Sequence, residues 1–159
     1  MTRIEPAVQP DEPSRSESSL FCSRCGAISP EATRRVCDRC EEGILLSCKR
    51  EALPGDAFVI CTYELVVTAV SDAGEQIFGT QETVLGARLL DLATCPLGEE
   101  QLARHTALAA QRPRDPVVLP LRLRSKQGDS LGMLAARVTT CGPPRAALVS
   151  VEQTGFGRR

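Results

Sequence analysis

Two C-x-x-C pairs near the beginning of the chain constrain its folding more than any other feature. Cys22 and Cys25 form the first pair and Cys37 and Cys40 the second, with eleven residues between the pairs. Two thiolates separated by two residues converge on a tight turn. Two such turns supply the tetrahedral set of four sulfur ligands that Zn²⁺ prefers. The spacing therefore predicts a zinc site made of these four cysteines.

The segment around these cysteines, residues 20–46, is too short to bury a hydrophobic core of its own. Structural zinc contributes on the order of 10 kcal/mol to the folding of such peptides, so the metal is expected to fold the segment. Gly26 and Gly43 allow the backbone to wrap closely around an ion. Four protein ligands leave no open coordination position, which predicts a structural zinc-ribbon-like module and not a catalytic centre.

Two other interpretations of the cysteine pairs remain open. Four thiolates also suit iron in a rubredoxin-like site. A dithiol redox pair is the second alternative, but a thioredoxin-type motif would be a single C-x-x-C between a strand and a helix, and that context is absent here.

Composition divides the rest of the chain into segments. Residues 1–19 are polar and proline-rich and predict a disordered tail. Residues 47–55 resemble a linker because they end in Leu-Pro-Gly, which continues neither a helix nor a central strand. Residues 56–153 carry the regular apolar pattern of a domain, and residues 154–159 are expected to be a C-terminal tail.

Short periodic segments alternate with turn residues from residue 56 onward. Residues 56–62 and 65–71 are rich in β-branched side chains and predict a hairpin. The segment 98–112 has the pattern of a longer helix, with two acidic residues at its beginning and Pro113 after its end. Shorter helices are expected at 72–79, 80–86 and 87–93, and further strands at 116–124, 130–140 and 145–153.

The stretch LVVTAVSDAGEQIFGTQETVLGARLLDL, residues 65–92, resembles the core signature of the PAS domain family. Phe78 and Gly79 match the family's fG, Leu85 and Gly86 match its lG, and Ser71 stands where an asparagine is common. The resemblance extends over residues 56–153. It implies an α+β fold with a PAS-like five-stranded antiparallel sheet and helices on one face, preceded here by the small zinc ribbon.

PAS domains are sensory and interaction modules, so the resemblance implies a protein partner, a homodimer, or a small ligand in the cavity. Flavin photochemistry is not expected, because residues 86–92, GARLLDL, lack the reactive cysteine of flavin-binding members. Haem-binding members use a histidine on the long helix, and His105 is the one histidine in this chain. His105 lies at the margin of the apolar stripe of its helix, a place usual for a boundary residue, and is the candidate haem ligand.

The other four cysteines have less specific interpretations. Cys61 lies in an expected strand and is interpreted as a buried apolar side chain. Cys48 is a thiol near the metal segment, while Cys95 and Cys141 are expected in accessible turns, where they could respond to oxidation. Cys95 and His105 have no third group to orient them, so no catalytic site and no enzyme are expected.

Charge and composition narrow the class of partner. The formal net charge is −1, and nucleic-acid-binding proteins usually carry a basic surplus. Residues 20–46 contain four arginines and four acidic residues, and four thiolates on Zn²⁺ add two negative charges, which argues against a nucleic-acid partner. No segment approaches the roughly 20 apolar residues that span a bilayer, so no membrane partner and a cytoplasmic location are expected. Abundant arginine and alanine are typical of a bacterial protein from a GC-rich genome.

These observations predict a sensory or regulatory interaction module that signals through protein contacts. The alternatives are a transcription-associated regulator that uses the ribbon on nucleic acid or polymerase, and a haem or small-ligand sensor.

Overall fold

A computed structural model describes residues 18–29, 35–55, 57–124 and 132–153. The predicted tails at 1–19 and 154–159 lie wholly or almost wholly outside these residues, as do Glu31 and Arg34 of the cysteine segment.

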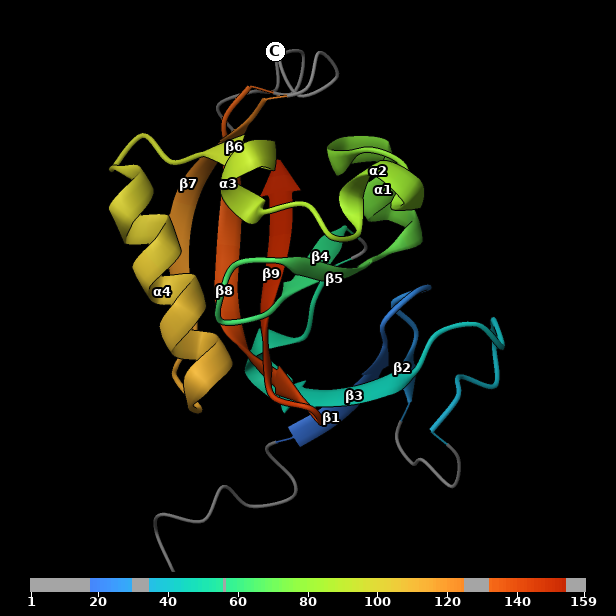
Figure 1. Ribbon diagram of the computed structural model, residues 1–159. Helices are drawn as coiled ribbons and strands as arrows, with labels where there is room; N and C mark the ends of the chain where they lie inside the picture. Colours follow the sequence, from blue (N-terminus) through green and yellow to red (C-terminus); the bar gives the residue numbers. More distant parts are fainter. Residues whose placement is uncertain (1–17, 30–34, 56, 125–131, 154–159) are drawn as a thin grey trace, which may run out of the picture.

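The dominant element is one curled antiparallel sheet of nine strands in the described part of the chain (Figure 1). Its main path runs β2-β1-β3-β8-β9-β4-β5, with β7 paired to β8 and β6 paired to β7. The strands are β1 (Ser18–Cys22), β2 (Ile28–Ser29), β3 (Leu45–Lys49), β4 (Phe58–Cys61), β5 (Val67–Val70), β6 (Ala93–Thr94), β7 (Val117–Leu123), β8 (Leu134–Gly142) and β9 (Ala146–Gln153).

Four α-helices and one 3₁₀ turn complete the described structure. The long helix α4 starts after Gly98, carries two glutamates in its first turn and ends before Pro113. The buried hydroxyl of Ser71 caps α1 by accepting hydrogen bonds from the backbone N–H groups of Gly74 and Phe58, both at 3.0 Å. The helices are α1 (Asp72–Phe78), α2 (Gln81–Val84), α3 (Leu89–Leu92) and α4 (Glu99–Gln111), and the 3₁₀ turn is η2 (Arg50–Ala52).

Strand β8 joins the cysteine segment to the rest of the sheet. One edge of β8 pairs with β9 over the range 134–141. The other edge pairs with β7 only up to Val138, so the backbone groups beyond it need a different partner. Strand β3 provides it: Ser47 lies opposite Gly142 and Cys48 opposite Cys141.

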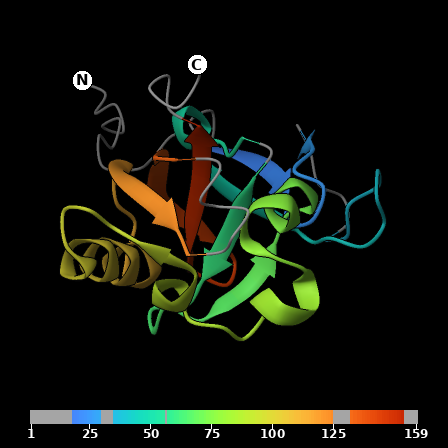
Figure 2. The same cartoon turned by 90° about the horizontal axis from the view of Figure 1, so that it is seen from above.

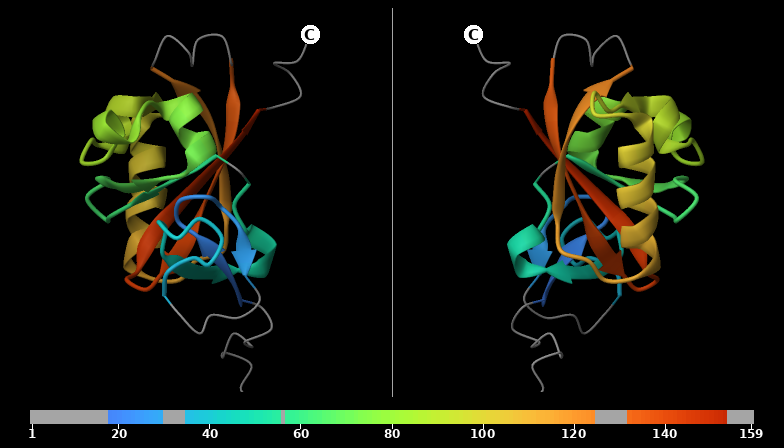
Figure 3. Two further views of the ribbon diagram at one scale, coloured as in Figure 1. Left: turned by 90° about the vertical axis from the view of Figure 1, so that its right-hand side faces the viewer. Right: turned by 90° about the vertical axis from the view of Figure 1, so that its left-hand side faces the viewer.

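The central strands are buried on both faces, and each face has its own core. Successive side chains of a strand point to opposite faces. In β4, Val59 and Cys61 therefore pack into the core beneath the helices, whereas Phe58 and Ile60 pack into a second core with Phe21. Figures 2 and 3 show the helices towards one side of the strands and the cysteine segment towards the other.

The expected fold class is wrong. A PAS-like five-stranded sheet with helices on one face and a separate zinc ribbon was predicted. Among the described residues the sheet instead has nine strands, curls, and includes β1, β2 and β3 of the cysteine segment. The physical reason is the edge of β8 beyond β7, which β3 covers as it brings a second apolar layer onto the sheet. Part of the segment expected as a linker, residues 47–49, is therefore strand.

The individual elements predicted between residues 56 and 153 are confirmed, apart from positions 56, 130 and 131 of two predicted strands, which lie outside the described residues. The short strand β6 was not anticipated, because two residues carry no periodic pattern. Among the described residues, none of the helices has the length and apolar character needed to cross a membrane.

Candidate metal centre

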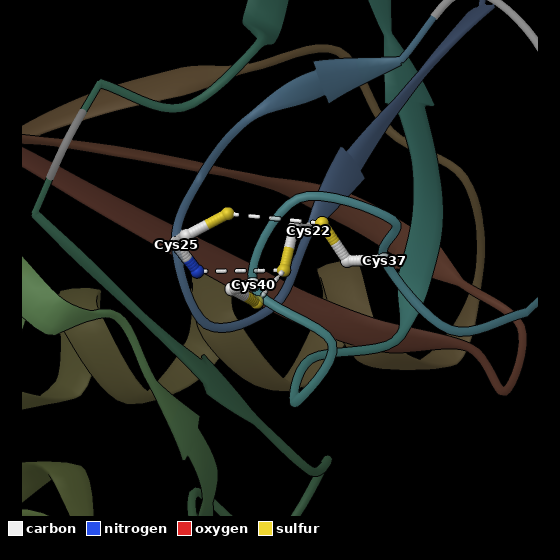
Figure 4. Close-up of side chains that lie close together, drawn as sticks. All are labelled: Cys22, Cys25, Cys37 and Cys40. Atoms are coloured by element: carbon white, nitrogen blue, oxygen red, sulfur yellow. Dashed lines mark hydrogen bonds between the residues drawn. The ribbon is translucent and has the colours of Figure 1, made fainter.

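The four predicted cysteines converge at one end of the curled sheet (Figure 4). Cys22 ends β1 and Cys25 lies in the turn after it, while Cys37 and Cys40 lie in the loop before β3. Their sulfur atoms all lie within 4.8 Å of one another. The Cys22–Cys40 and Cys25–Cys37 Sγ distances are 3.5 and 3.8 Å. A tetrahedron with metal–sulfur bonds of about 2.3 Å has edges of roughly 3.8 Å, so the four thiols are close enough to hold a metal ion.

The two turns that carry the cysteines repeat one backbone geometry. In the first, the Arg24 N–H lies 3.3 Å from the Cys22 sulfur, and the Arg39 N–H lies 3.3 Å from the Cys37 sulfur in the second. A hydrogen bond to the backbone carbonyl of the first cysteine closes each turn, donated by the N–H of Gly26 at 3.1 Å and of Glu41 at 3.0 Å. Both closing residues have positive φ, 78° and 61°. Backbone donors directed at sulfur stabilise thiolate charge, which metal binding requires.

Backbone contacts and burial change the proton affinities of the metal-free thiols in opposite directions. Burial raises the pKa of Cys22 to about 12 and also raises the pKa of Cys25. The backbone N–H groups of Glu42 and Gly43 lower the pKa of Cys40 to about 7. Cys40 is therefore a thiol that gives up its proton near neutral pH.

An arginine between the first two ligands fixes this centre to the helical part of the molecule. The Arg24 guanidinium contacts the carboxylates of Asp72, at 2.9 Å, and Glu75, both on α1. It also donates to the Val70 carbonyl at 3.1 Å. The hydrogen bond from Arg24 lowers the pKa of Glu75. Arg24 is thus an internal anchor, and its charge is neutralised within the molecule.

An aromatic contact anchors the same segment to the sheet. The rings of Phe21 and Phe58 meet edge to face, with centroids 5.5 Å apart and an interplanar angle of 90°. Both side chains are fully buried. The cysteine segment therefore packs against the rest of the chain through Phe21.

The same segment also carries three exposed, large aliphatic side chains. Ile28 is 51% exposed, Val36 37% and Ile44 39%. The backbone pairs Val36 with Ile44. Contiguous exposed apolar side chains mark interaction surfaces, and the pairing of Val36 with Ile44 places two of these side chains next to each other.

The candidate haem ligand does not line a cavity that the structure describes. His105 lies on α4, half-buried, and does not line any of the three described clefts. Burial lowers its pKa, as do the charges of Arg104 and Arg114. Its Nδ1 atom is buried and has no hydrogen-bond partner in the described part of the chain.

The remaining cysteines are all buried. This confirms the interpretation of Cys61, whereas the expected exposure of Cys95 and Cys141 is wrong, because Cys95 packs into the core beneath the helices and Cys141 into the second core with Phe21. The register that places Cys48 opposite Cys141 was not foreseen, since no local pattern reports which distant strands pair. No protein-family model and no curated protein matches this chain.

Proposed function

We propose that this chain is a small regulatory protein that binds another protein through its cysteine segment, which a bound metal ion stabilises. The proposal keeps the interaction role expected from the sequence. It drops the sensory role that depended on a PAS fold, because that fold is not present.

Zinc is the metal that we assign to the centre. The ligands are four sulfurs, and their separations suit a tetrahedral ion. Such a site holds the chain in shape and performs no reaction, because all coordination positions are filled by protein.

The observation that carries the interaction role is the exposure of Ile28, Val36 and Ile44 on a segment that packs against the sheet through Phe21, Leu46 and Cys48. Zinc would hold these side chains in a fixed arrangement that a partner can recognise. A rigid surface loses little conformational entropy on binding, so a small apolar patch contributes more to affinity when it is preorganised.

The charges beside the patch favour a protein over a nucleic acid. Asp38, Glu41 and Glu42 outnumber Arg35 and Arg39 among the described residues of the second turn and its approach. Arg24 is already paired with two carboxylates, and a zinc ion with four thiolates carries two further negative charges. A polyanion would be repelled by this surface.

Native mass spectrometry combined with metal analysis tests the zinc assignment. We expect one zinc per chain in the purified protein, and no zinc in a C22S/C40S variant. Iron in place of zinc, or equal metal content in the variant, would contradict the assignment.

Quantitative affinity capture tests the binding role. We expect a partner that is retained by the native protein to be lost with I44E and with the C22S/C40S variant. V118E is the matched control, because Val118 is an exposed aliphatic residue on β7, outside the cysteine segment. A set of captured proteins that is identical for the native protein and I44E would refute the proposed surface.

A further inference from the structure

A basic cleft lies where β3 meets β8, beside the C-terminal end of α4. Its volume is about 350 Å³, and its lining includes the side chains of Cys48, Lys49, Arg114, Cys141 and Arg145. An adjoining hollow of about 400 Å³ shares Lys49 and Arg114 and adds Arg112 and Asp115. Cavities of a few hundred Å³ are of the size that takes small organic ligands.

Positive charge predominates among the side chains around the cleft. Arginine and lysine contribute four cations, and Asp115 is the one carboxylate among the described lining residues. Asp115 pairs with Lys49 at 2.6 Å and is otherwise exposed. The remaining cations are arginines, whose planar guanidinium groups bind carboxylates and phosphates in a two-pronged manner.

Arg114 shows where an anion is expected to bind. Its Nη1 atom is buried and has no hydrogen-bond partner among the described residues. Buried guanidinium N–H groups are almost always paired, and Arg114 lines both hollows, so its guanidinium group has hydrogen-bonding capacity left for an acceptor that enters them.

The end of helix α4 does not oppose an anion here, because donors already cover its free carbonyls. Arg145 donates to the Gln111 carbonyl at 2.9 Å. The Thr140 hydroxyl lies 2.6 Å from the Ala109 carbonyl and 3.0 Å from that of Arg112. The negative end of the helix dipole is thereby capped.

Two nearly buried cysteines also line the cleft and add no charge to it. Burial raises the pKa of Cys48 to about 12, and burial followed by the nearby Cys48 raises that of Cys141 to about 12. Both thiols are therefore protonated at neutral pH and act as small apolar groups beneath the cations.

We infer that this cleft binds a small organic anion, whose phosphate or carboxylate group lies on Arg114 and whose apolar portion lies over Cys48 and Cys141. The inference does not depend on the proposed protein-binding role, because the cleft lies at the β3–β8 junction and the exposed aliphatic residues lie outside it.

Calorimetric titration of the full chain with phenyl phosphate and with benzoate tests the inference. We expect saturable binding of at least one compound, one per chain, and the tighter of the two identifies the preferred oxyanion. Arg114→Gln should weaken binding at least about tenfold. Arg114→Lys keeps the positive charge but loses the planar guanidinium group. This variant should fold normally and should weaken binding less than Arg114→Gln does. Arg122→Gln is the matched control, because Arg122 is exposed on β7 outside the cleft, and it should bind as the native protein does.

Three results would overturn the inference. The first is the absence of saturable binding of both compounds up to about 10 mM. The second is unchanged affinity when Arg114 is replaced by glutamine and by lysine. The third is that inorganic phosphate binds as tightly as either aromatic compound, since this would mean that contact with Cys48 and Cys141 adds nothing to the affinity.

Discussion

Gly43 lies against the first cysteine turn with no room for a side chain. A Cβ atom at this position would overlap the Cys22 sulfur and lie 2.8 Å from both the Cβ and the backbone nitrogen of Arg24. Contacts this short are not tolerated, so a larger residue must displace a ligand of the metal. The requirement for glycine here is steric and does not arise from backbone conformation.

We therefore expect Gly43→Ala to lower metal affinity at least about tenfold, because disturbing the contacts that orient metal ligands commonly costs that much. Competition with a chromogenic chelator measures the effect. Gly55→Ala is the control, since a Cβ there would approach only the Ser150 hydroxyl, at 4.0 Å. Equal affinity for the two variants would contradict the packing described at Gly43.

His105 gives a second prediction at the level of single residues. Burial and two nearby arginines lower its pKa below the ordinary value of 6.5. Between the native and unfolded pKa values the unfolded chain binds the proton more readily. The contribution to stability is thus complete above about pH 6.5 and declines as the pH falls towards the native pKa.

Proton NMR of the one histidine ring should give a titration midpoint below about 6.5. Urea unfolding at about pH 7.5 and about pH 5.5 should show a smaller loss of stability for His105→Gln than for the native protein. A midpoint at or above the ordinary value would show that the ring is more exposed, or nearer a carboxylate, than described.

At the level of elements, the contact between β1 and β4 holds the cysteine segment on the sheet. Replacing the fully buried Phe21 by alanine should lower the free energy of unfolding by about 3–5 kcal/mol. Tyr63→Ala, at an exposed aromatic residue, should change it by less than about 0.5 kcal/mol. Chemical denaturation measures both values, and similar values for the two variants would mean that Phe21 does not anchor β1.

The elements also show what could be predicted from the sequence. The bounds of α4 follow from its acidic first turn and Pro113, and the apolar pattern of the β7 strand is also local, so both elements were predicted. The convergence of the four cysteines was predictable because their spacing encodes two matching turns. Each of these features depends on residues close together in the chain.

The pairing of distant elements could not be predicted. Nothing near Cys48 indicates that its partner strand is β8, and nothing near Val138 indicates that β7 stops pairing there. The resemblance of residues 65–92 to the PAS family suggested a sheet that did not include the cysteine segment. The basic cleft was missed for the same reason, because Lys49, Arg114 and Arg145 come together only through the β3–β8 junction and the end of α4.

At the level of the whole molecule, both faces of the central strands are apolar, and each face must be covered by other parts of the chain. The core that includes Phe58, Ile60 and Leu148 is closed by the cysteine segment. Removing the metal should therefore loosen this cover and expose apolar surface on the central strands.

A strong chelator should lower the melting temperature by more than about 5 °C and increase the fluorescence of a dye that binds apolar surface. The C22S/C40S variant should give the same melting temperature without chelator, and adding chelator to it should have no further effect. An unchanged melting temperature after complete metal removal would mean that packing alone holds the segment.

The position of β3 beside β8 also has a consequence for the order of events during synthesis. The four cysteines leave the ribosome well before β8 and β9, so their centre can load metal while most of the sheet is still missing. The cysteine segment then lacks its neighbouring strand until β8 emerges and pairs with β3, and β9 pairs in turn with β8. Metal supply during translation would thus decide whether β8 meets a formed edge or an unstructured one, and β8 and β9 would complete a sheet begun by β1, β2 and β3.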